Sequence, residues 1–123
     1  MGFVVEGLND EKDLKQAMPS AYCVVTNGTR MNNRVKMDLR KALEECDVVY
    51  LLTDPDEAGD VLAQMVWRQC PSLERVYLDQ SQCLSYRYDR LKVGVEHCEV
   101  DYLRSVFKQI REWIGSGFVA QFG

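Results

Sequence analysis

The stretch that decides the fold is Leu51-Leu52-Thr53-Asp54-Pro55-Asp56-Glu57-Ala58-Gly59-Asp60. It closes an apolar run that begins at Val48, and the aliphatic, aromatic and β-branched side chains of that run predict a buried strand. Pro55 ends the strand, because it fixes φ and has no N–H. An amphipathic helical pattern follows from Ala58 to Val66. Four carboxylates are therefore expected on the turn after a strand, where α/β proteins bind ligands.

Two of these carboxylates, Asp54 and Asp56, stand two residues apart, so both can point at one cation. Carboxylates packed this closely repel one another unless a positive charge lies between them. Oxygen ligands of this kind suit Mg²⁺ or Mn²⁺ better than Zn²⁺. The plainer alternative is a polar loop in which Asp56 caps the next helix. For an isolated Asp-x-Asp the plainer alternative is favoured, and a third carboxylate from elsewhere in the chain would favour the metal.

Composition limits the classes of protein to consider. The chain has 123 residues, 46% hydrophobic and 28% charged, which fits one globular domain with a core. No apolar run approaches the ~18 residues of a membrane span, and the N-terminus lacks a signal-peptide pattern. Five cysteines without C-x-x-C spacing predict neither a zinc site nor disulfides, and we expect reduced thiols in a cytoplasm. The net charge of −4 argues against a broad electrostatic grip on nucleic acid but allows a local one.

Predicted strands and helices alternate along the chain, which is typical of a parallel sheet covered by helices on both faces. Residues 79–90 have no clear period and are expected to form a loop, with room for a short helical turn. A second short connection, with at most one β-bridge, is expected at 92–97. Residues 115–123 are expected to be a tail that packs on the body. The strands are expected at 2–5, 22–25, 48–53 and 75–78, and the helices at about 9–18, 33–45, 57–68 and 100–113.

The third carboxylate comes from the first strand, which ends in Glu6-Gly7. In a doubly wound sheet of order 2-1-3-4, strands one and three are neighbours at the switch point. Their carboxyl ends then place Glu6 beside Asp54 and Asp56. Convergence of three carboxylates from distant parts of the chain favours the metal site over a simple polar loop.

These residues resemble the Toprim domain, which is shared by topoisomerases, bacterial primases and several nucleases. The resemblance rests on Val4-Val5-Glu6-Gly7 together with the stretch from Leu51 to Gly59. The segments 26–28, 53–56 and 94–97 are similar to the branch of ribonucleases that matures 5S ribosomal RNA. The similarity spans about residues 3 to 110. It implies a Rossmann-like α/β fold, a single Toprim domain over residues 1–114, and a bacterial, cytoplasmic protein.

The resemblance also implies chemistry. Glu6, Asp54 and Asp56 would be catalytic and would bind Mg²⁺ or Mn²⁺ for phosphoryl transfer on RNA or DNA, with Glu6 able instead to act as general acid or base. One interpretation is a small nuclease. The other is a non-catalytic, metal-binding accessory module that acts with a nucleic-acid-processing partner protein or as a homodimer. Leu8, Val61 and Ala63 stand where related chains carry basic residues, which favours the second interpretation, whereas the intact set of Glu6, Asp54 and Asp56 favours the first. The small nuclease is the preferred interpretation.

Other residues are assigned secondary roles. Arg30, Arg34 and Lys36 follow the second strand and are expected either to contact nucleic acid or to form a solvated helix face, the two being equally supported. Asp60 is either a peripheral metal ligand or a first-turn helix residue favoured by the dipole. His97 is the single histidine of the chain, and a lone histidine is more often structural than catalytic. Lys92 could reach a phosphate, and Glu96 could orient a neighbouring side chain.

Overall fold

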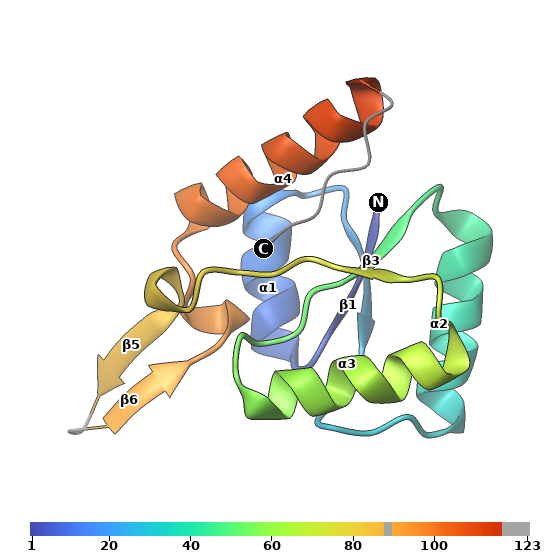
Figure 1. Cartoon of the computed structure of the whole chain (residues 1–123), viewed down its shortest axis with the longest axis horizontal. Helices are drawn as coiled ribbons and strands as arrows, with labels where there is room; N and C mark the ends of the chain where they lie inside the picture. Colours follow the sequence, from blue (N-terminus) through green and yellow to red (C-terminus); the bar gives the residue numbers. More distant parts are fainter. Residues whose placement is uncertain (88–89, 117–123) are drawn as a thin grey trace.

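The computed structural model describes residues 1–87 and 90–116, with backbone alone described for 85–87, 90–92 and 111–116. The central element is a four-stranded parallel sheet of order β2-β1-β3-β4 (Figure 1). Its strands are β1 (Gly2–Val5), β2 (Tyr22–Val25), β3 (Val49–Leu51) and β4 (Glu74–Arg75). The predicted order is confirmed, and the first and third strands are neighbours, with Phe3 aligned to Tyr50.

Four α-helices cover the two faces of this sheet: α1 (Leu8–Ala17), α2 (Asn33–Glu45), α3 (Glu57–Gln69) and α4 (Val100–Ser116). Side chains alternate along β1, because successive strand residues point to opposite faces. Phe3 and Val5 pack with Leu14 of α1 and Leu103 of α4. Val4 packs on the other face with residues of α2 and α3. The predicted α/β architecture with helices on both faces is confirmed.

Helix starts agree with the local sequence. Asn32 caps α2 by accepting the Val35 N–H at 3.0 Å, and Asp56 caps α3 by accepting the Gly59 N–H at 2.7 Å. The first helix begins one residue earlier than predicted. It begins at Leu8, and Asp10 is its third residue, accepting the Gly7 N–H at 2.9 Å. The Asp10 carboxylate therefore satisfies the backbone N–H of Gly7, the residue just before the helix.

The segment 79–93 corrects the predicted loop. A short 3₁₀ turn, η1 (Gln80–Gln82), fits the expectation of a helical turn, but the antiparallel strands β5 (Leu84–Arg87) and β6 (Arg90–Val93) follow it. This hairpin extends away from the main sheet (Figure 1). A second 3₁₀ turn, η2 (Val95–His97), leads to α4. The fourth strand of the main sheet is also shorter than predicted, although the Val76 N–H still donates to the Leu51 carbonyl at 2.8 Å.

The cysteines provide a second correction. Cys83 and Cys98 form a disulfide, so the prediction of five reduced thiols is wrong for this pair. The two residues are 15 positions apart and meet because the hairpin brings the chain back on itself. Cys23, Cys46 and Cys70 are free and half-buried.

No helix in the part of the chain that the structure describes is both long and apolar enough to cross a membrane. From residue 117 on, the predicted tail lies outside the described residues.

Candidate active site

The candidate site lies at the carboxyl ends of β1 and β3. Hydrogen bonds between the strands persist to this edge, since the Thr26 N–H donates to Val5 O at 3.0 Å and the Leu52 N–H donates to Val4 O at 2.9 Å. The Gly28 N–H then donates to Glu6 O at 3.2 Å. The fold thus brings Glu6, which follows β1, to the turn that carries Asp54 and Asp56.

Glu6 is an acid of this site with a strongly raised pKa. Burial raises the pKa of Glu6 from 4.5 to about 7, helped by a hydrogen bond shared with the Asp54 carboxyl and by the negative charges of Asp54, Asp56 and Asp10. One carboxylate oxygen of Glu6 also accepts a long hydrogen bond, 3.4 Å, from the Thr29 hydroxyl. Glu6 is therefore half-buried among acids, an arrangement that a cation would relieve.

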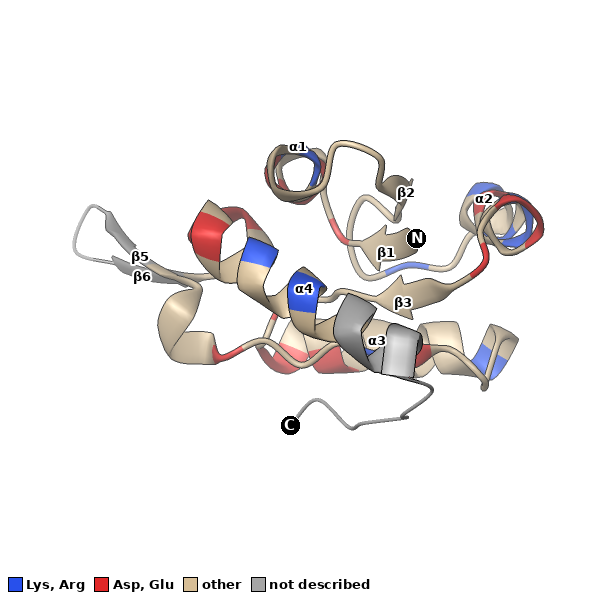
Figure 2. Cartoon of the chain, turned by 90° about the horizontal axis from the view of Figure 1, so that it is seen from above, with Lys and Arg blue, Asp and Glu red and all other residues tan. Residues whose placement is uncertain are grey.

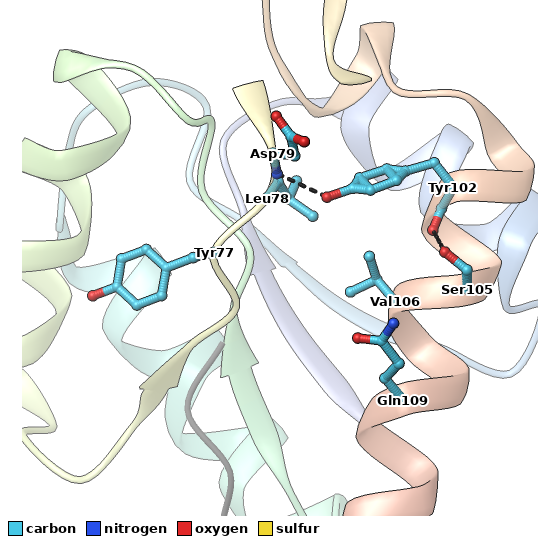
Figure 3. A pocket seen from close by; sticks show the side chains of 7 residues that line it. All are labelled: Tyr77, Leu78, Asp79, Tyr102, Ser105, Val106 and Gln109. Atoms are coloured by element: carbon cyan, nitrogen blue, oxygen red, sulfur yellow. Dashed lines mark hydrogen bonds between the residues drawn. The ribbon is translucent and has the colours of Figure 1, made fainter. Parts of the chain in front are cut away.

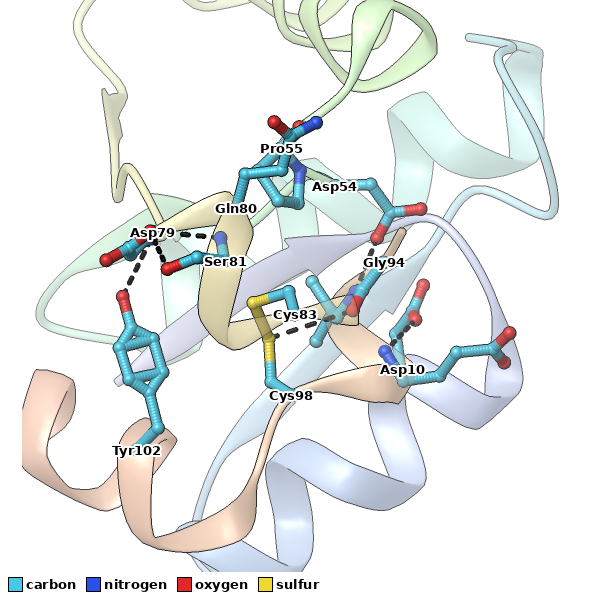
Figure 4. The surroundings of a disulfide bond; sticks show 12 residues. Asp10, Asp54, Pro55, Asp79, Gln80, Ser81, Cys83, Gly94, Cys98 and Tyr102 are labelled. Carbon is cyan, nitrogen blue, oxygen red and sulfur yellow. Dashed lines mark hydrogen bonds between the residues drawn. A yellow bond between two sulfur atoms is a disulfide. The ribbon is translucent and has the colours of Figure 1, made fainter. Parts of the chain in front are cut away.

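Asp54 is held from several sides. Its Oδ1 accepts the Val95 N–H at 2.8 Å, and its backbone carbonyl accepts from Arg75 Nη2 at 3.2 Å. Gly94 lies flat against the carboxylate, because a Cβ at that position would be 3.4 Å from both Asp54 oxygens. Gly94 and η2 therefore fix the orientation of the carboxylate (Figure 4), and β4 holds the backbone of the same turn.

Asp56 acts as the cap of α3, which bears out the structural role that the plainer interpretation gave it. This role occupies one of its two carboxylate oxygens. The turn depends on Gly59, since a Cβ there would lie 1.8 Å from the Asp54 carbonyl oxygen. A glycine is needed here because the helix approaches the turn at backbone contact distance.

Asp10 is a buried site residue that the sequence argument missed. It is 5% exposed, and its two oxygens accept the Gly7 and Glu96 N–H groups at 2.9 and 3.0 Å. Burial, followed by the charge of Asp54, raises its pKa from 3.8 to about 6. Asp10 therefore joins the segment after Glu6 to the η2 turn. Its place three residues after Gly7, from where a carboxylate can accept the N–H of the residue before a helix, is the signal that could have identified it.

Arg75 is the second residue that the sequence argument missed. Its guanidinium donates to Asp60 Oδ1 at 2.7 Å, and its side chain is 7% exposed. The same group lies 5.0 Å from the centre of the Tyr77 ring. Asp60, expected as a peripheral ligand or a helix-turn residue, is thus paired with a buried cation. This pairing compensates its negative charge.

The remaining predicted residues are distributed unevenly. Glu96 and His97 lie together on η2, with Glu96 Oε1 and His97 Nε2 3.2 Å apart. Lys92 lies on β6, and its side chain is outside the described part of the structure. Arg34 is an exposed residue of α2 near Asp38, with the two charged groups 3.9 Å apart.

The segment before α2 contacts Glu6 and carries Arg30 next to that contact. Asn27 and Gly28 adopt positive φ angles of 57° and 113°, which turn the chain sharply after β2. Thr29 contacts Glu6, and the Arg30 N–H donates to Gly28 O at 3.0 Å. Lys36 lies further along, on exposed helix surface. Figure 2 shows both basic and acidic residues on α2 and acidic residues at the start of α3.

Two observations bear on a metal at this site, and they differ. The crowding around Glu6 supplies oxygen donors and uncompensated negative charge, which suit a divalent cation. Yet no three His, Cys, Asp or Glu side chains, within the described ranges, already stand close enough together to hold an ion. The donor chemistry fits the group and carries more weight, because the Glu6 side chain, held by a long 3.4 Å hydrogen bond from Thr29, can turn toward a cation at the fixed Asp54 and Asp56.

A surface pocket of about 390 Å³ lies elsewhere, between residues 77–79 and α4 (Figure 3). Tyr102 closes one end by accepting the Asp79 N–H through its hydroxyl at 2.7 Å. None of Glu6, Asp54 and Asp56 lines this pocket. The candidate active site is therefore an open edge of the sheet and lies apart from this hollow.

Comparison with known proteins agrees with this geometry. The chain is 28% identical over 109 residues to Ribonuclease M5 of Bacillus anthracis, covering 89% of this chain and 57% of that protein. It is 29% identical over 97 residues to Ribonuclease M5 of Staphylococcus aureus, covering 79% of this chain and 52% of that protein. The chain therefore spans little more than half the length of these relatives.

A solved structure extends the comparison. The small TOPRIM domain protein from Bacillus stearothermophilus superimposes with a TM-score of 0.67 and 28% identity, covering 89% of this chain and 87% of that one. Residues 2–80, which carry Glu6, Asp54 and Asp56, match the Toprim domain. The parallel sheet of order β2-β1-β3-β4 and this match together show that the chain belongs to the Toprim domain family.

Proposed function

We propose that this protein is a divalent-metal-dependent nuclease that hydrolyses phosphodiester bonds in RNA or DNA, with Glu6, Asp54 and Asp56 as its catalytic residues and metal ligands. The observation that carries the proposal is the contact between Glu6 and Asp54 at adjacent strand ends, where burial, followed by the neighbouring acids, raises the pKa of Glu6 to about 7. Toprim domains generally bind divalent metals, and the ribonuclease relatives support a role in nucleic-acid processing.

Each acid has a distinct part in this proposal. Mg²⁺ or Mn²⁺, when bound, would stabilise negative charge on the phosphodiester. Asp54 presents a fixed carboxylate, because Val95 and Gly94 hold it in place. Asp56 keeps its orientation through the Gly59 N–H. Glu6 either ligates the ion as a carboxylate or, with a pKa near neutrality, holds and releases a proton as general acid or base.

Substrate binding requires positive charge near these acids. Arg30 is the basic residue on the loop that contacts Glu6, and Arg34 and Lys36 continue from it onto α2. We infer that Arg30 contacts a phosphate beside the one that is cleaved, with Arg34 and Lys36 further along the strand. Because the whole chain carries a net charge of −4, this local cluster would make binding sensitive to salt.

A second candidate function is an accessory module with weak or partner-dependent activity. Leu8, next to Gly7, is 66% exposed, and Val61, in the first turns of α3, is 46% exposed. Neither can contact a phosphate, so two charge-assisted contacts worth ~1.5–3 kcal/mol each would be missing. Under this reading, a partner protein or a second copy of the chain holds the nucleic acid.

The test is single-turnover cleavage of labelled structured RNA and single-stranded DNA by the purified chain, with and without Mg²⁺ or Mn²⁺. A nuclease should cleave one of them in a metal-dependent way, and Asp54→Asn should abolish cleavage. Asp47→Asn is the matched control, because Asp47 is exposed and precedes β3 at the opposite edge of the sheet. Binding without cleavage under every metal condition would support the accessory module.

A further inference from the structure

The β5–β6 hairpin has two chemically different faces. Its register pairs Ser85 with Lys92 and Arg87 with Arg90, and the alternate positions pair Leu84 with Val93 and Tyr86 with Leu91. Residues directly opposite each other in an antiparallel pair belong to the same face, and successive residues belong to opposite faces. Arg87, Arg90 and Lys92 therefore share one face, which we term the basic face, and the other face is apolar.

Like residues 30–41, the hairpin concentrates positive charge in an acidic chain. Residues 84–93 contain three basic residues and one acid, whereas the whole chain carries a net charge of −4. Two short strands place these three basic residues within a few positions of one another. No other described element of the structure pairs basic positions across a strand register.

The base of the hairpin adjoins the candidate active site. The Gly94 N–H donates to Cys83 O at 3.1 Å, and the Cys83–Cys98 disulfide joins the chain on either side of the hairpin. Gly94, the residue after β6, lies against the Asp54 carboxylate, and Val95 donates its N–H to that carboxylate at 2.8 Å. The residue that follows the hairpin, Gly94, thus contacts a proposed catalytic acid, Asp54 (Figures 1 and 4).

The spacing suits a phosphodiester strand. A β-strand rises about 3.4 Å per residue, so Lys92 and Arg90 lie about 7 Å and about 14 Å along the chain from Gly94. Phosphates that follow one another along a nucleic-acid strand cover such a distance in roughly two to four nucleotides. A strand with one phosphodiester at Glu6 and Asp54 could therefore continue along the basic face.

We propose that the basic face of the β5–β6 hairpin, formed by Arg87, Arg90 and Lys92, binds the phosphate backbone of the nucleic-acid strand on which the Glu6–Asp54 site acts. This inference rests on the proposed function and names its substrate-binding element. The acids at the site repel a phosphate backbone, so positive charge beside them is needed for a strand to approach. The hairpin supplies that charge where Leu8 and Val61 do not.

The test is binding of a fluorescent single-stranded oligonucleotide by fluorescence anisotropy across a range of salt, in a chelator so that no cleavage occurs. The variant is Arg87→Gln, Arg90→Gln, Lys92→Gln. The control variant is Lys41→Gln, Arg68→Gln, Lys108→Gln, which removes the same charge from exposed positions on α2, α3 and α4. Thermal unfolding of both variants confirms that each is folded.

We expect the hairpin variant to lower the slope of log affinity against log salt by about 2, as for three phosphate contacts on a single strand. The control should lower it by less than half as much. Equal effects of the two variants, or an unchanged slope in the hairpin variant, would overturn the inference. If the wild type binds no oligonucleotide, this inference fails, and cleavage in the presence of metal decides the proposed function separately.

The remaining outcomes separate the two proposals. If the wild type cleaves in a metal-dependent way but the hairpin variant binds as well as the wild type, the nuclease proposal is supported and the hairpin proposal is overturned. Hairpin-dependent binding by a wild type that never cleaves would support the hairpin and overturn the nuclease.

Discussion

Val95 donates its backbone N–H to Asp54 Oδ1 over 2.8 Å, although the two residues are 41 positions apart. The next residue, Glu96, donates its N–H to Asp10 Oδ1 at 3.0 Å. The η2 turn thereby orients one acid that follows β3 and another from the first helix. Because the hydrogen bonds come from the backbone, no side chain in this turn needs to be polar for the site to form.

Gly59→Ala adds only one methyl group but should disrupt the turn that carries Asp54 and Asp56. The new Cβ would lie 1.8 Å from the Asp54 carbonyl oxygen, so the turn or the start of α3 must move. We expect a loss of about 3 kcal/mol or more in the free energy of unfolding, at the upper end of overpacking effects, measured by urea unfolding. Gly7→Ala is the control, because its Cβ would make an ordinary 3.7 Å contact. Equal stability of the two variants would contradict the close approach.

Glu6 should make the metal-free protein less stable as the pH rises. Its pKa is about 7 in the folded state against 4.5 for the free side chain, so the folded state binds more protons between these values. Stability from this group is present at low pH and is lost as the pH rises toward 7. In chelator, the free energy of unfolding of Glu6→Gln should therefore exceed that of the wild type increasingly from pH 5 to pH 7. A constant difference across this range would show that Glu6 titrates normally.

The sequence predicted those parts of the site that depend on local pattern or on sheet topology. Glu6 and Asp54 meet because strands one and three are neighbours at the switch point, which the alternation of strands and helices already implied. Asn32 and Asp56 cap their helices as residues of their type do. Each of these features is encoded within a few residues or follows from strand order.

The missed features depend on contacts between distant segments. Asp10 and Glu96 are 86 positions apart, and Arg75 reaches Asp60 across 15 positions, so no periodicity in the sequence records either contact. The hairpin strands have four residues each, and the residues between them, Tyr88-Asp89, are not the Asn-Gly or Asp-Gly pair that marks a tight turn. Because the hairpin was not predicted, no predicted element placed Cys83 near Cys98.

Loss of the disulfide should destabilise the protein without abolishing its fold. The bond closes a loop of 15 residues, for which the chain-entropy estimate is about 3 kcal/mol. We expect Cys83→Ser, Cys98→Ser to lose roughly this amount in denaturant unfolding, and Cys70→Ser, at a free half-buried cysteine, to lose much less. Alkylation of the unfolded, unreduced wild type should modify three thiols, the remainder of the five cysteines. Modification of all five would show that the bond is absent.

Divalent metal should stabilise the protein by mass action. Mg²⁺ or Mn²⁺ at one hundred times its dissociation constant should add about 2.7 kcal/mol to the free energy of unfolding, seen as a rise in the melting temperature. Asp54→Asn should remove that rise, and Asp47→Asn should keep it. Calorimetry that detects no binding at millimolar metal in the wild type would contradict the assignment of Glu6, Asp54 and Asp56 as ligands.

Among the three predicted basic residues, Arg30 should matter most for nucleic-acid binding. Arg30 lies on the turn whose Thr29 contacts Glu6, so it is the member of the group nearest the candidate site. Arg34 is 84% exposed on α2 and faces Asp38, which offsets part of its charge, and Lys36 lies on exposed helix surface. Replacement of all three by alanine should weaken oligonucleotide binding and lower its dependence on salt.

Within that loss, Arg30→Ala alone should account for the larger share. Arg34→Ala should have an effect similar to Arg40→Ala, which removes another exposed charge one to two turns further along α2. The measurement is fluorescence anisotropy at low and moderate salt, with thermal unfolding to confirm that each variant is folded. If the triple variant binds as well as the wild type, the basic residues of this segment form a solvated helix face, and the phosphate contacts must come from elsewhere, with the hairpin as the remaining source of clustered positive charge.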